Sequence, residues 1–485
     1  MRKLSRRLAR VHLLLALWLG WLLLWVLLSG SLSFYRAELD SWQHPVLAAP
    51  QGPLPGAELS AQQALRYLAQ QAPTATQWYL QLPSERQPYL TLHWQLPAAA
   101  SASDNAGRFR SGPFYQQWLA ADGSVALAPP QQVKAGDHRH QLGGLFFQLH
   151  YSLLQAAGPY SRSLVAYLAL LWLLLSFTGL YSLRGRFGAL WQWRLPGLVI
   201  ARNKQLRHQQ LALLTLPFAL LFAATGWLTQ ILSENPAPLQ QLYPQGSAEF
   251  YQQLFPQPVR LQSDSPQAAQ QLTPAQRQQL LLAALPGLMQ QASRDWQGKR
   301  VGKLNLSQPL QAGMQLTLQS AAADRIGNKP DSQSFMLRSK AGQATAPLWQ
   351  QLPVATHAST LPAAHSRDFW YGVHQSLFWG QTLRLLLLLC GLASCWMLWL
   401  GVRSWLQRQA GFYLPALIGS GFLAVPAAML LLLLWVPLAT RLTPALLATL
   451  SLPQWLALAW CLSFSGWLGW YRLRFLAAAS LARRG

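Results

Sequence analysis

Six long apolar segments constrain the fold of this 485-residue chain more than any other feature. Each is long enough to cross a bilayer as a helix, since about 20 residues at helical rise span the hydrocarbon core. The alternative for any one segment is a buried helix of a soluble protein, but six in one chain favour an α-helical polytopic membrane protein. Pro426 interrupts the fifth segment and predicts a kink there. The predicted spans cover residues 11–34, 160–183, 209–232, 380–402, 413–438 and 452–472.

The distribution of charge predicts the orientation of these spans. The net charge of +24 resembles that of a nucleic-acid-binding protein, but all 14 acidic residues fall in the stretches 38–137 and 234–368. The charged residues of the other connections and of both termini are only Lys and Arg. The one of these basic residues on the predicted outer side is Arg441, in the short link between the fifth and sixth segments. Basic excess in short loops marks the cytoplasmic side of a membrane. We therefore predict two cytoplasmic termini, two large outer segments, contact with membrane lipid and no nucleic-acid partner.

The first apolar segment has a second interpretation, as a cleaved signal peptide. Its apolar run is longer than the roughly 7–15 residues of a signal sequence, and no small-x-small cleavage site follows it closely. We therefore expect an uncleaved membrane anchor.

The sequence also excludes several cofactor classes. Cys390, Cys395 and Cys461 all lie in predicted helices, so the outer segments have no disulfide framework. The chain contains no Cys-x-x-Cys-His, no Gly-x-Gly-x-x-Gly at a strand–helix junction and no Walker sequence. Thioether-attached haem and the usual nicotinamide or flavin domain are thereby excluded.

Four histidines lie at the ends of the first four apolar segments: His12, His150, His208 and His374. With each segment crossing the bilayer, His12 and His208 lie at the inner face, and His150 and His374 at the outer face. A pair of imidazoles in a helix bundle holds a b-type haem, and two such haems carry electrons across a membrane. One histidine near a helix end is often only an interfacial polar residue, but four at matched positions favour ligands. We predict two haem b groups whose iron is bound by these four imidazoles.

The chain shows signs of internal duplication. His12 and His208 are each followed 17 residues later by a small polar residue and a glycine, Ser29-Gly30 and Thr225-Gly226. His150 and His374 also stand in similar contexts, His-Tyr-Ser-Leu and His-Gln-Ser-Leu. Chance similarity among Leu-rich helices is the alternative. We predict a duplicated helix–domain–helix core.

Both outer segments have the pattern of an α+β module. A helix is predicted at 61–69 and at 274–284, each after a Ser or Thr start signal. Strand patterns follow at 77–82, 89–95, 300–306, 314–319 and 334–337, with a hairpin at 121–123. The predicted organisation is 1–34 (basic segment and first span), 35–149 (first outer module), 150–183 (second span with its histidine segment), 184–208 (basic cytoplasmic loop), 209–232 (third span), 233–372 (second outer module), 373–402, 413–438 and 452–472 (fourth to sixth spans) and 473–485 (basic cytoplasmic tail).

Six motifs together resemble those of a known family. They are Leu-Ser-Gly-Ser at 28–31, Leu-His-Tyr-Ser-Leu-Leu at 149–154, Thr-Gly-Leu-Tyr at 178–181, Arg-His-Gln-Gln at 207–210, Thr-Gly-Trp at 225–227 and Phe-Trp-Tyr-Gly-Val-His-Gln at 369–375. Over about residues 1–405 the chain resembles the PepSY-associated transmembrane proteins, an iron-regulated inner-membrane group that includes ferric-siderophore reductases. The resemblance implies PepSY-like periplasmic modules, a bacterial inner-membrane location, two b haems and reduction of siderophore-bound ferric iron. The fifth and sixth predicted helices go beyond the four-helix core of that family.

Cations near the histidines are candidate partners for haem propionates. Arg7 and Arg10 lie at the inner face, and Arg162 and Arg384 at the outer face. Arg384 is the strongest candidate because it lies within an apolar run. The alternative is an arginine that extends its charged group to the membrane interface.

Aromatic side chains surround the outer histidines in the sequence, and they are either a docking wall for substrate or a membrane-interface belt. A metal site at His138 and His140 is not favoured, because no Cys or carboxylate cluster accompanies them. The aromatic residues are Phe146, Phe147, Tyr151, Trp370, Tyr371, Phe378 and Trp379.

The histidine pairs favour a dihaem oxidoreductase with an unidentified electron donor, and the resemblance implies a ferric siderophore as its acceptor. A second hypothesis is a non-enzymatic sensor or assembly factor whose outer modules bind a peptide or a partner. A transporter is a third hypothesis, but the helices lack the paired acidic residues of a proton-coupled site.

Overall fold

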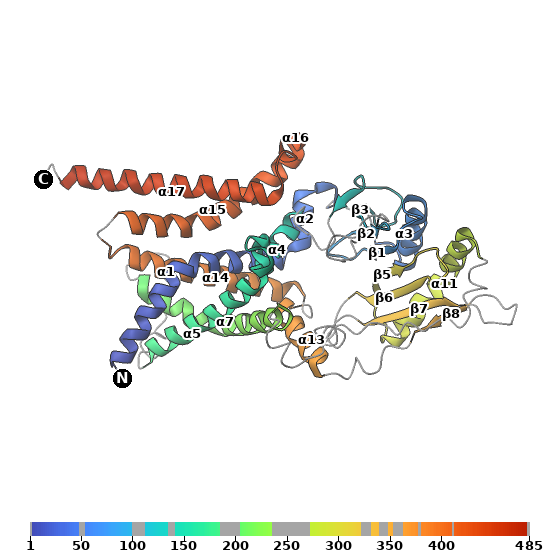
Figure 1. Cartoon of the computed structure of the whole chain (residues 1–485), viewed down its shortest axis with the longest axis horizontal. Helices are drawn as coiled ribbons and strands as arrows, with labels where there is room; N and C mark the ends of the chain where they lie inside the picture. The colour runs from blue at the N-terminus through green and yellow to red at the C-terminus, as the bar shows by residue number, and fades with distance from the viewer. Residues whose placement is uncertain are drawn as a thin grey trace. The chain divides into compact units, whose positions relative to one another are not determined.

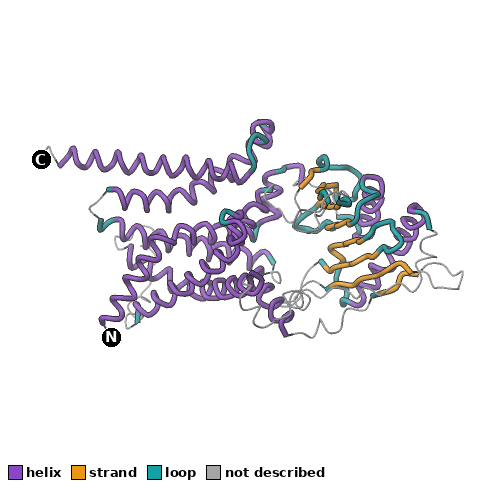
Figure 2. The backbone as a smooth tube through the Cα atoms, viewed as in Figure 1, coloured by secondary structure: helices purple, strands orange, loops and turns teal. Residues whose placement is uncertain are grey.

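The computed structural model shows two compact units. The helical unit comprises Met1–Gln43, His138–Asn235 and His374–Gly485, and the sheet unit comprises His44–Asp137 and Pro236–Val373. Within the part of the chain that the structure describes, all strands belong to the sheet unit (Figure 2). The described residues are 2–47, 54–98, 112–133, 141–184, 204–234, 272–321, 331–338, 348–352, 362–376, 380–409 and 412–482.

Helices of very different length build the helical unit (Figure 1). The short helices α2 and α4 lie within the predicted first outer module, but in the structure they pack with each other and with the helical unit. The helices are α1 (Arg2–Ser33), α2 (Arg36–Gln43), α4 (Leu142–Ser152), α5 (Ser161–Leu183), α7 (Lys204–Glu234), α14 (Gln381–Leu406), α15 (Tyr413–Leu442), α16 (Pro444–Leu447) and α17 (Leu452–Ala482), with the end of α13 (Pro362–Gln375).

Five of these helices are long and apolar enough to cross a membrane. They correspond to the first five predicted segments and cover Leu4–Ser33, Ser161–Leu183, Lys204–Gln230, Gln381–Leu406 and Tyr413–Leu442. The sixth predicted segment forms the 31-residue helix α17 but is not among them. Its Trp, Ser and Gly residues lower its mean hydropathy, so the sixth span stays a prediction. α15 continues as a helix through Pro426.

The bundle is held by apolar packing between helices far apart in the sequence. α1 packs against α4, α5, α14 and α15, and α7 packs against α5 and α14. Leu23, Phe146 and Leu432 are buried in one continuous core. Leu386 and Leu434 remain more than half exposed, at 55% and 59%. Large apolar side chains on the outside of such a bundle are suited to contact with lipid.

The sheet unit contains one antiparallel sheet of eight strands, ordered β4-β3-β2-β1-β5-β6-β7-β8. The strands of the two predicted modules therefore join in a single sheet. The junction is the antiparallel β1–β5 pair, in which Trp78 lies opposite Leu306 and Leu80 opposite Leu304. The strands are β1 (Gln77–Gln81), β2 (Tyr89–Gln95), β3 (Phe114–Ala120), β4 (Gln131–Val133), β5 (Val301–Ser307), β6 (Gln315–Ser320), β7 (Ser332–Arg338) and β8 (Leu348–Gln351).

Two helices, α3 (Ala57–Gln71) and α11 (Pro274–Asp295), pack together and share a core with the sheet. The predicted start signal of α11 is confirmed, because Thr273 and Gln276 form a reciprocal capping box. The predicted start of α3 is wrong. α3 begins at Ala57, and Ser60 lies inside it, buried, where its hydroxyl donates to the carbonyl of Ala121 at 2.8 Å.

Side chains of α2 hold the beginning of α4, the helix that carries His150. The first amides of a helix have no partner within it, and α4 has no side-chain cap of its own. Asp40 Oδ1 accepts from the amide of Gly143 at 2.8 Å, and Gln43 Oε1 accepts from the amide of Leu142 at 2.7 Å. The side chains of Asp40 and Gln43 are both buried. α2 therefore fixes the position of α4.

The Asp40 carboxyl gives this junction a pH dependence. Burial raises the pKa of Asp40 from 3.8 to about 6, although Arg36 and the α4 amides oppose the shift. Because the folded pKa is the higher one, the stabilisation by proton binding is present below about pH 4 and is lost as the pH rises through about 6. Asp40→Asn keeps an acceptor oxygen without the charge. We expect the thermal midpoint in detergent to fall less between pH 4 and 7 in Asp40→Asn than in the wild type. Identical pH profiles would contradict this assignment.

Candidate functional site

The four predicted histidines come from four different helices and meet in two pairs. The ring centroids of His12 on α1 and His208 on α7 lie 6.4 Å apart, with the ring planes at 72°. The ring centroids of His150 on α4 and His374 on α13 lie 5.8 Å apart, with the planes at 14°. The structure thus brings together the partners that the predicted topology pairs.

The two pairs lie at opposite ends of the bundle. α1 carries His12 and contacts His150 at Gly30, while α7 carries His208 and contacts His374 at Gly226. On each helix the two positions are separated by about 27 Å at helical rise. The hydrocarbon core of a bilayer is about 30 Å thick. The pairs are therefore spaced to lie near the two faces of a membrane.

Three of the histidines bond through Nδ1 to a backbone carbonyl of a neighbouring helix. A backbone carbonyl is only an acceptor, so each Nδ1 carries the proton. The proton-free Nε2 is then available to bind a metal, as in ligating histidines whose other nitrogen is fixed by a hydrogen bond. The bonds run from His12 to Leu175 at 3.1 Å, from His150 to Val26 at 2.9 Å and from His208 to Met397 at 2.8 Å.

His374 has a side-chain partner instead. Its Nδ1 lies 3.0 Å from Thr225 Oγ1, and that hydroxyl donates its own proton to the carbonyl of Leu221 at 2.7 Å. The hydroxyl oxygen therefore accepts from Nδ1, which leaves His374 in the same tautomer as the other three. Thr178 Oγ1 lies 3.1 Å from His12 Nδ1 in a similar way, beside the Leu175 carbonyl.

A glycine of the neighbouring helix faces each imidazole. A Cβ at Gly30 would lie 2.6 Å from His150 Nδ1, and a Cβ at Gly226 would lie 3.0 Å from His374 Cε1. In the same way, a Cβ at Gly401 would lie 3.0 Å from His208 Nδ1, and a Cβ at Gly179 would lie 3.4 Å from His12 Cε1. The missing side chains leave space for the rings between closely packed helices. Gly30 and Gly226, which recur 18 residues after His12 and His208 in the sequence, thus contact the second histidine pair, His150 and His374.

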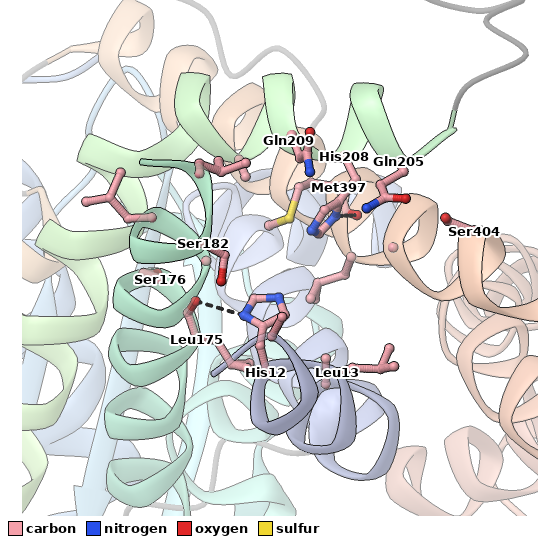
Figure 3. Close-up of a pocket in the computed structure, with 18 of the residues that line it drawn as sticks. His12, Leu13, Leu175, Ser176, Ser182, Gln205, His208, Gln209, Met397 and Ser404 are labelled. Carbon is pink, nitrogen blue, oxygen red and sulfur yellow. Dashed lines mark hydrogen bonds between the residues drawn. The ribbon is translucent and has the colours of Figure 1, made fainter. Parts of the chain in front are cut away.

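A cavity of about 430 Å³ adjoins the first pair, lined by α1, α5, α7 and α14. Its walls are mostly apolar, and both His12 and His208 lie in them. Figure 3 shows the two rings pointing into the space between the helices. Two cations, Arg10 and Arg408, also line it. Arg408 Nη1 donates to Ser404 Oγ at 3.2 Å and to Gln205 Oε1 at 3.3 Å. A flat apolar group with anionic substituents suits such a cavity.

The donor set fits a haem. A bond from an imidazole nitrogen to a transition metal is about 2 Å long, so one metal between two Nε2 atoms places the ring centroids about 6 Å apart. The observed separations are 6.4 and 5.8 Å. Among the residues that the structure describes, no group of three or more His, Cys, Asp or Glu could hold a metal ion. Each imidazole pair could supply two ligands to a haem iron, and the porphyrin would supply four nitrogens.

The four arginines predicted as propionate partners differ in their surroundings. Arg7 and Arg10 are both exposed on α1, and Arg10 also lines the cavity beside His12. The Arg162 guanidinium lies 5.4 Å from the centroid of the Tyr151 ring. Arg384 is half-buried in the first turn of α14.

The predicted aromatic cluster divides between core and surface positions. Phe146 is fully buried in the helical core, so it is not part of a docking wall. Phe147 and Tyr151 lie on α4 with ring centroids 5.0 Å apart, and Trp370 and Tyr371 lie on α13. Phe378, Trp379, His138 and His140 lie outside the described residues.

The hydrogen-bond acceptors of the imidazoles, the glycine contacts and the place of Arg408 in the cavity were not predicted from the sequence. Met397 and Gly401 belong to the fourth apolar segment, where nothing in the sequence distinguishes a backbone carbonyl. The Thr178-Gly179 and Thr225-Gly226 pairs were a usable signal, since each lies in one of the six family-like motifs. Arg408 follows Arg403 by five residues, just after the same segment. In the sequence both arginines indicate only that this loop is cytoplasmic.

A family model described as the PepSY-associated TM region matches residues 9–408. The chain therefore belongs to this family of membrane proteins, as its motifs predict. No curated protein matches the chain. The matched region includes all four histidines, their glycines and Arg408, while α15 to α17 lie beyond it.

The glycine contacts predict a difference between two substitutions. Ala in place of Gly generally stabilises a helix by about 0.5–1 kcal/mol, so any loss reports on the imidazole. Gly30→Ala places a Cβ 2.6 Å from His150 Nδ1, whereas Gly179→Ala places one at an ordinary 3.4 Å from His12 Cε1. We expect Gly30→Ala to lose about half of the bound haem and Gly179→Ala to keep it, as measured by haem absorption per chain. Equal haem content in both variants would show that the close contact is unimportant.

Proposed function

We propose that this protein is a dihaem b-type electron conduit of the bacterial inner membrane that reduces siderophore-bound ferric iron to Fe(II) in the periplasm. The observation that carries the proposal is the pair of bis-imidazole sites at opposite ends of one helix bundle. Two pairs of partly buried imidazoles, with ring centroids 6.4 and 5.8 Å apart and each Nδ1 hydrogen-bonded, support a role as ligands.

The residues of the chain would hold the haem as follows. The four imidazoles would bind the haem iron, and the carbonyls of Val26, Leu175 and Met397 orient three of them. Arg10 and Arg408 line the first cavity, where they would pair with propionate groups. Haem bound there supplies reversible one-electron redox chemistry. The protein's task is to fix the ligands, exclude water and set the potential.

The basic loops support the orientation of this conduit. With the termini in the cytoplasm, His12 and His208 lie at the inner face, and His150 and His374 at the outer face. In this orientation α17 is the sixth span and the two large outer segments are periplasmic. The matched contacts of α1 with His150 and of α7 with His374 support a duplicated core.

The proposed reaction transfers one electron to each ferric ion. A donor at the cytoplasmic side or in the membrane supplies the electron, and the ferric siderophore accepts it outside. Hard oxygen ligands hold Fe(II) less tightly than Fe(III), so the reduced iron leaves the chelator.

Reoxidation by substrate tests this function. Chemically reduced protein should be reoxidised by ferric siderophores of the hydroxamate or catecholate class, with one Fe(II) trapped by a ferrous chelator for each electron. We expect His374→Ala to slow this reaction on the order of tenfold or more, since it would remove one of the imidazoles that hold the haem. A wild-type protein that keeps its electrons with several chemically different siderophores would contradict the reductase function and favour a sensor or assembly factor.

The pairing of the histidines is tested separately. His12→Ala and His208→Ala should deplete one spectral species, and His150→Ala and His374→Ala the other, in redox-titrated absorption spectra. The reason is that each substitution removes one of the two ligands of one iron. The pairing is wrong if His12→Ala and His150→Ala deplete the same species.

A further inference from the structure

The hydrogen bond at His374 differs in kind from those at the other three histidines. His12, His150 and His208 each donate to a backbone carbonyl. His374 Nδ1 donates to the Thr225 hydroxyl. That side chain is completely buried, so water does not take the place of a carbonyl there.

Several contacts fix His374 in this arrangement. The Thr225 hydroxyl is oriented by its own bond to the Leu221 carbonyl at 2.7 Å. The Phe222 ring lies 5.6 Å from the His374 ring, and the Gly226 position approaches its Cε1. The imidazole is therefore held against one face of α7, with the hydroxyl as its acceptor.

The identity of the acceptor affects the metal. A strong acceptor at Nδ1–H makes Nε2 a more basic ligand, and a more basic ligand stabilises ferric over ferrous iron. A peptide carbonyl belongs to a group with a large dipole, and it polarises the N–H more than an alcohol oxygen does. A hydroxyl acceptor therefore gives a higher reduction potential than a carbonyl would.

We propose that Thr225 is a positioning residue that gives His374 a weaker acceptor than the carbonyls at the other three histidines, and that the reduction potential of the His150–His374 site therefore lies above that of the His12–His208 site. Electron movement from the first pair to the second is then downhill. This inference rests on the proposed function, because it requires a redox group at both pairs.

The chain provides a matched control on the other side of the bundle. Thr178 also places its hydroxyl 3.1 Å from a histidine Nδ1, that of His12, and also precedes a glycine. There, however, the Leu175 carbonyl lies at the same distance. Removing the Thr178 hydroxyl leaves His12 an acceptor, whereas removing the Thr225 hydroxyl takes away the oxygen to which His374 Nδ1 donates.

The experiment measures the two midpoint potentials by spectroelectrochemical titration of the full-length protein. Thr225→Val keeps the side-chain shape but removes the acceptor, so the potential of the His150–His374 site should shift upward. Thr225→Ser should restore the wild-type value, and Thr178→Val should leave the His12–His208 potential unchanged. If Thr225→Val does not retain haem, Thr225→Ala provides the same measurement.

Three results would overturn the inference. They are an unshifted potential in the Thr225 variants that lack the hydroxyl, an equal shift in Thr178→Val, or a wild-type His150–His374 site with the lower potential. Each leaves the proposed function intact, because two reducible haems are still present. A wild-type protein without two reducible haems would instead contradict the proposed function itself.

Discussion

The structure depends on how four imidazoles are accommodated inside an apolar helix bundle. A buried polar group without a partner costs about 1–3 kcal/mol, so each ring needs an acceptor at Nδ1. Neighbouring helices supply it, from α5 and α14 for the first pair and from α1 and α7 for the second. A glycine beside each ring lets those helices come close enough. The same contacts that satisfy the rings thereby fix which nitrogen is free and where it points.

The sequence predicts the four histidines, their pairing and six apolar helices, five of which are long and apolar enough to cross a membrane, because these depend on local composition and on the order of membrane crossings. It does not predict the acceptor of His150, because the carbonyl of Val26 is chemically like any other and lies far away in the chain. The sequence assigns α2 and α4 to an outer module, but the structure places both in the helical unit. The sequence does not reveal the contacts of Asp40 and Gln43 that join the two helices. The joining of the two strand sets is likewise a long-range pairing, of β1 with β5.

The C-terminal helices beyond the family match are attached to the N-terminal helices by aromatic contacts. Trp42 Nε1 donates to the carbonyl of Leu433 on α15 at 3.1 Å, and Trp21 stacks on Trp460 of α17 with centroids 6.4 Å apart. Arg441, the basic residue that departs from the charge pattern, lies 5.6 Å from the centroid of the Trp42 ring. A cation–π contact with Trp42 therefore accounts for a basic residue at this position. α1, which carries His12, therefore packs on one side against α15 and α17.

The most direct test of the account is the low-temperature electron paramagnetic resonance spectrum of the oxidised, purified protein, combined with haem quantification. Bis-imidazole ligation at both sites predicts two low-spin ferric haems per chain. The nearly parallel rings of His150 and His374 and the steeply inclined rings of His12 and His208 predict two distinguishable signals. A colourless protein from haem-replete cells, or a haem in the high-spin state expected of a single axial imidazole, would contradict it.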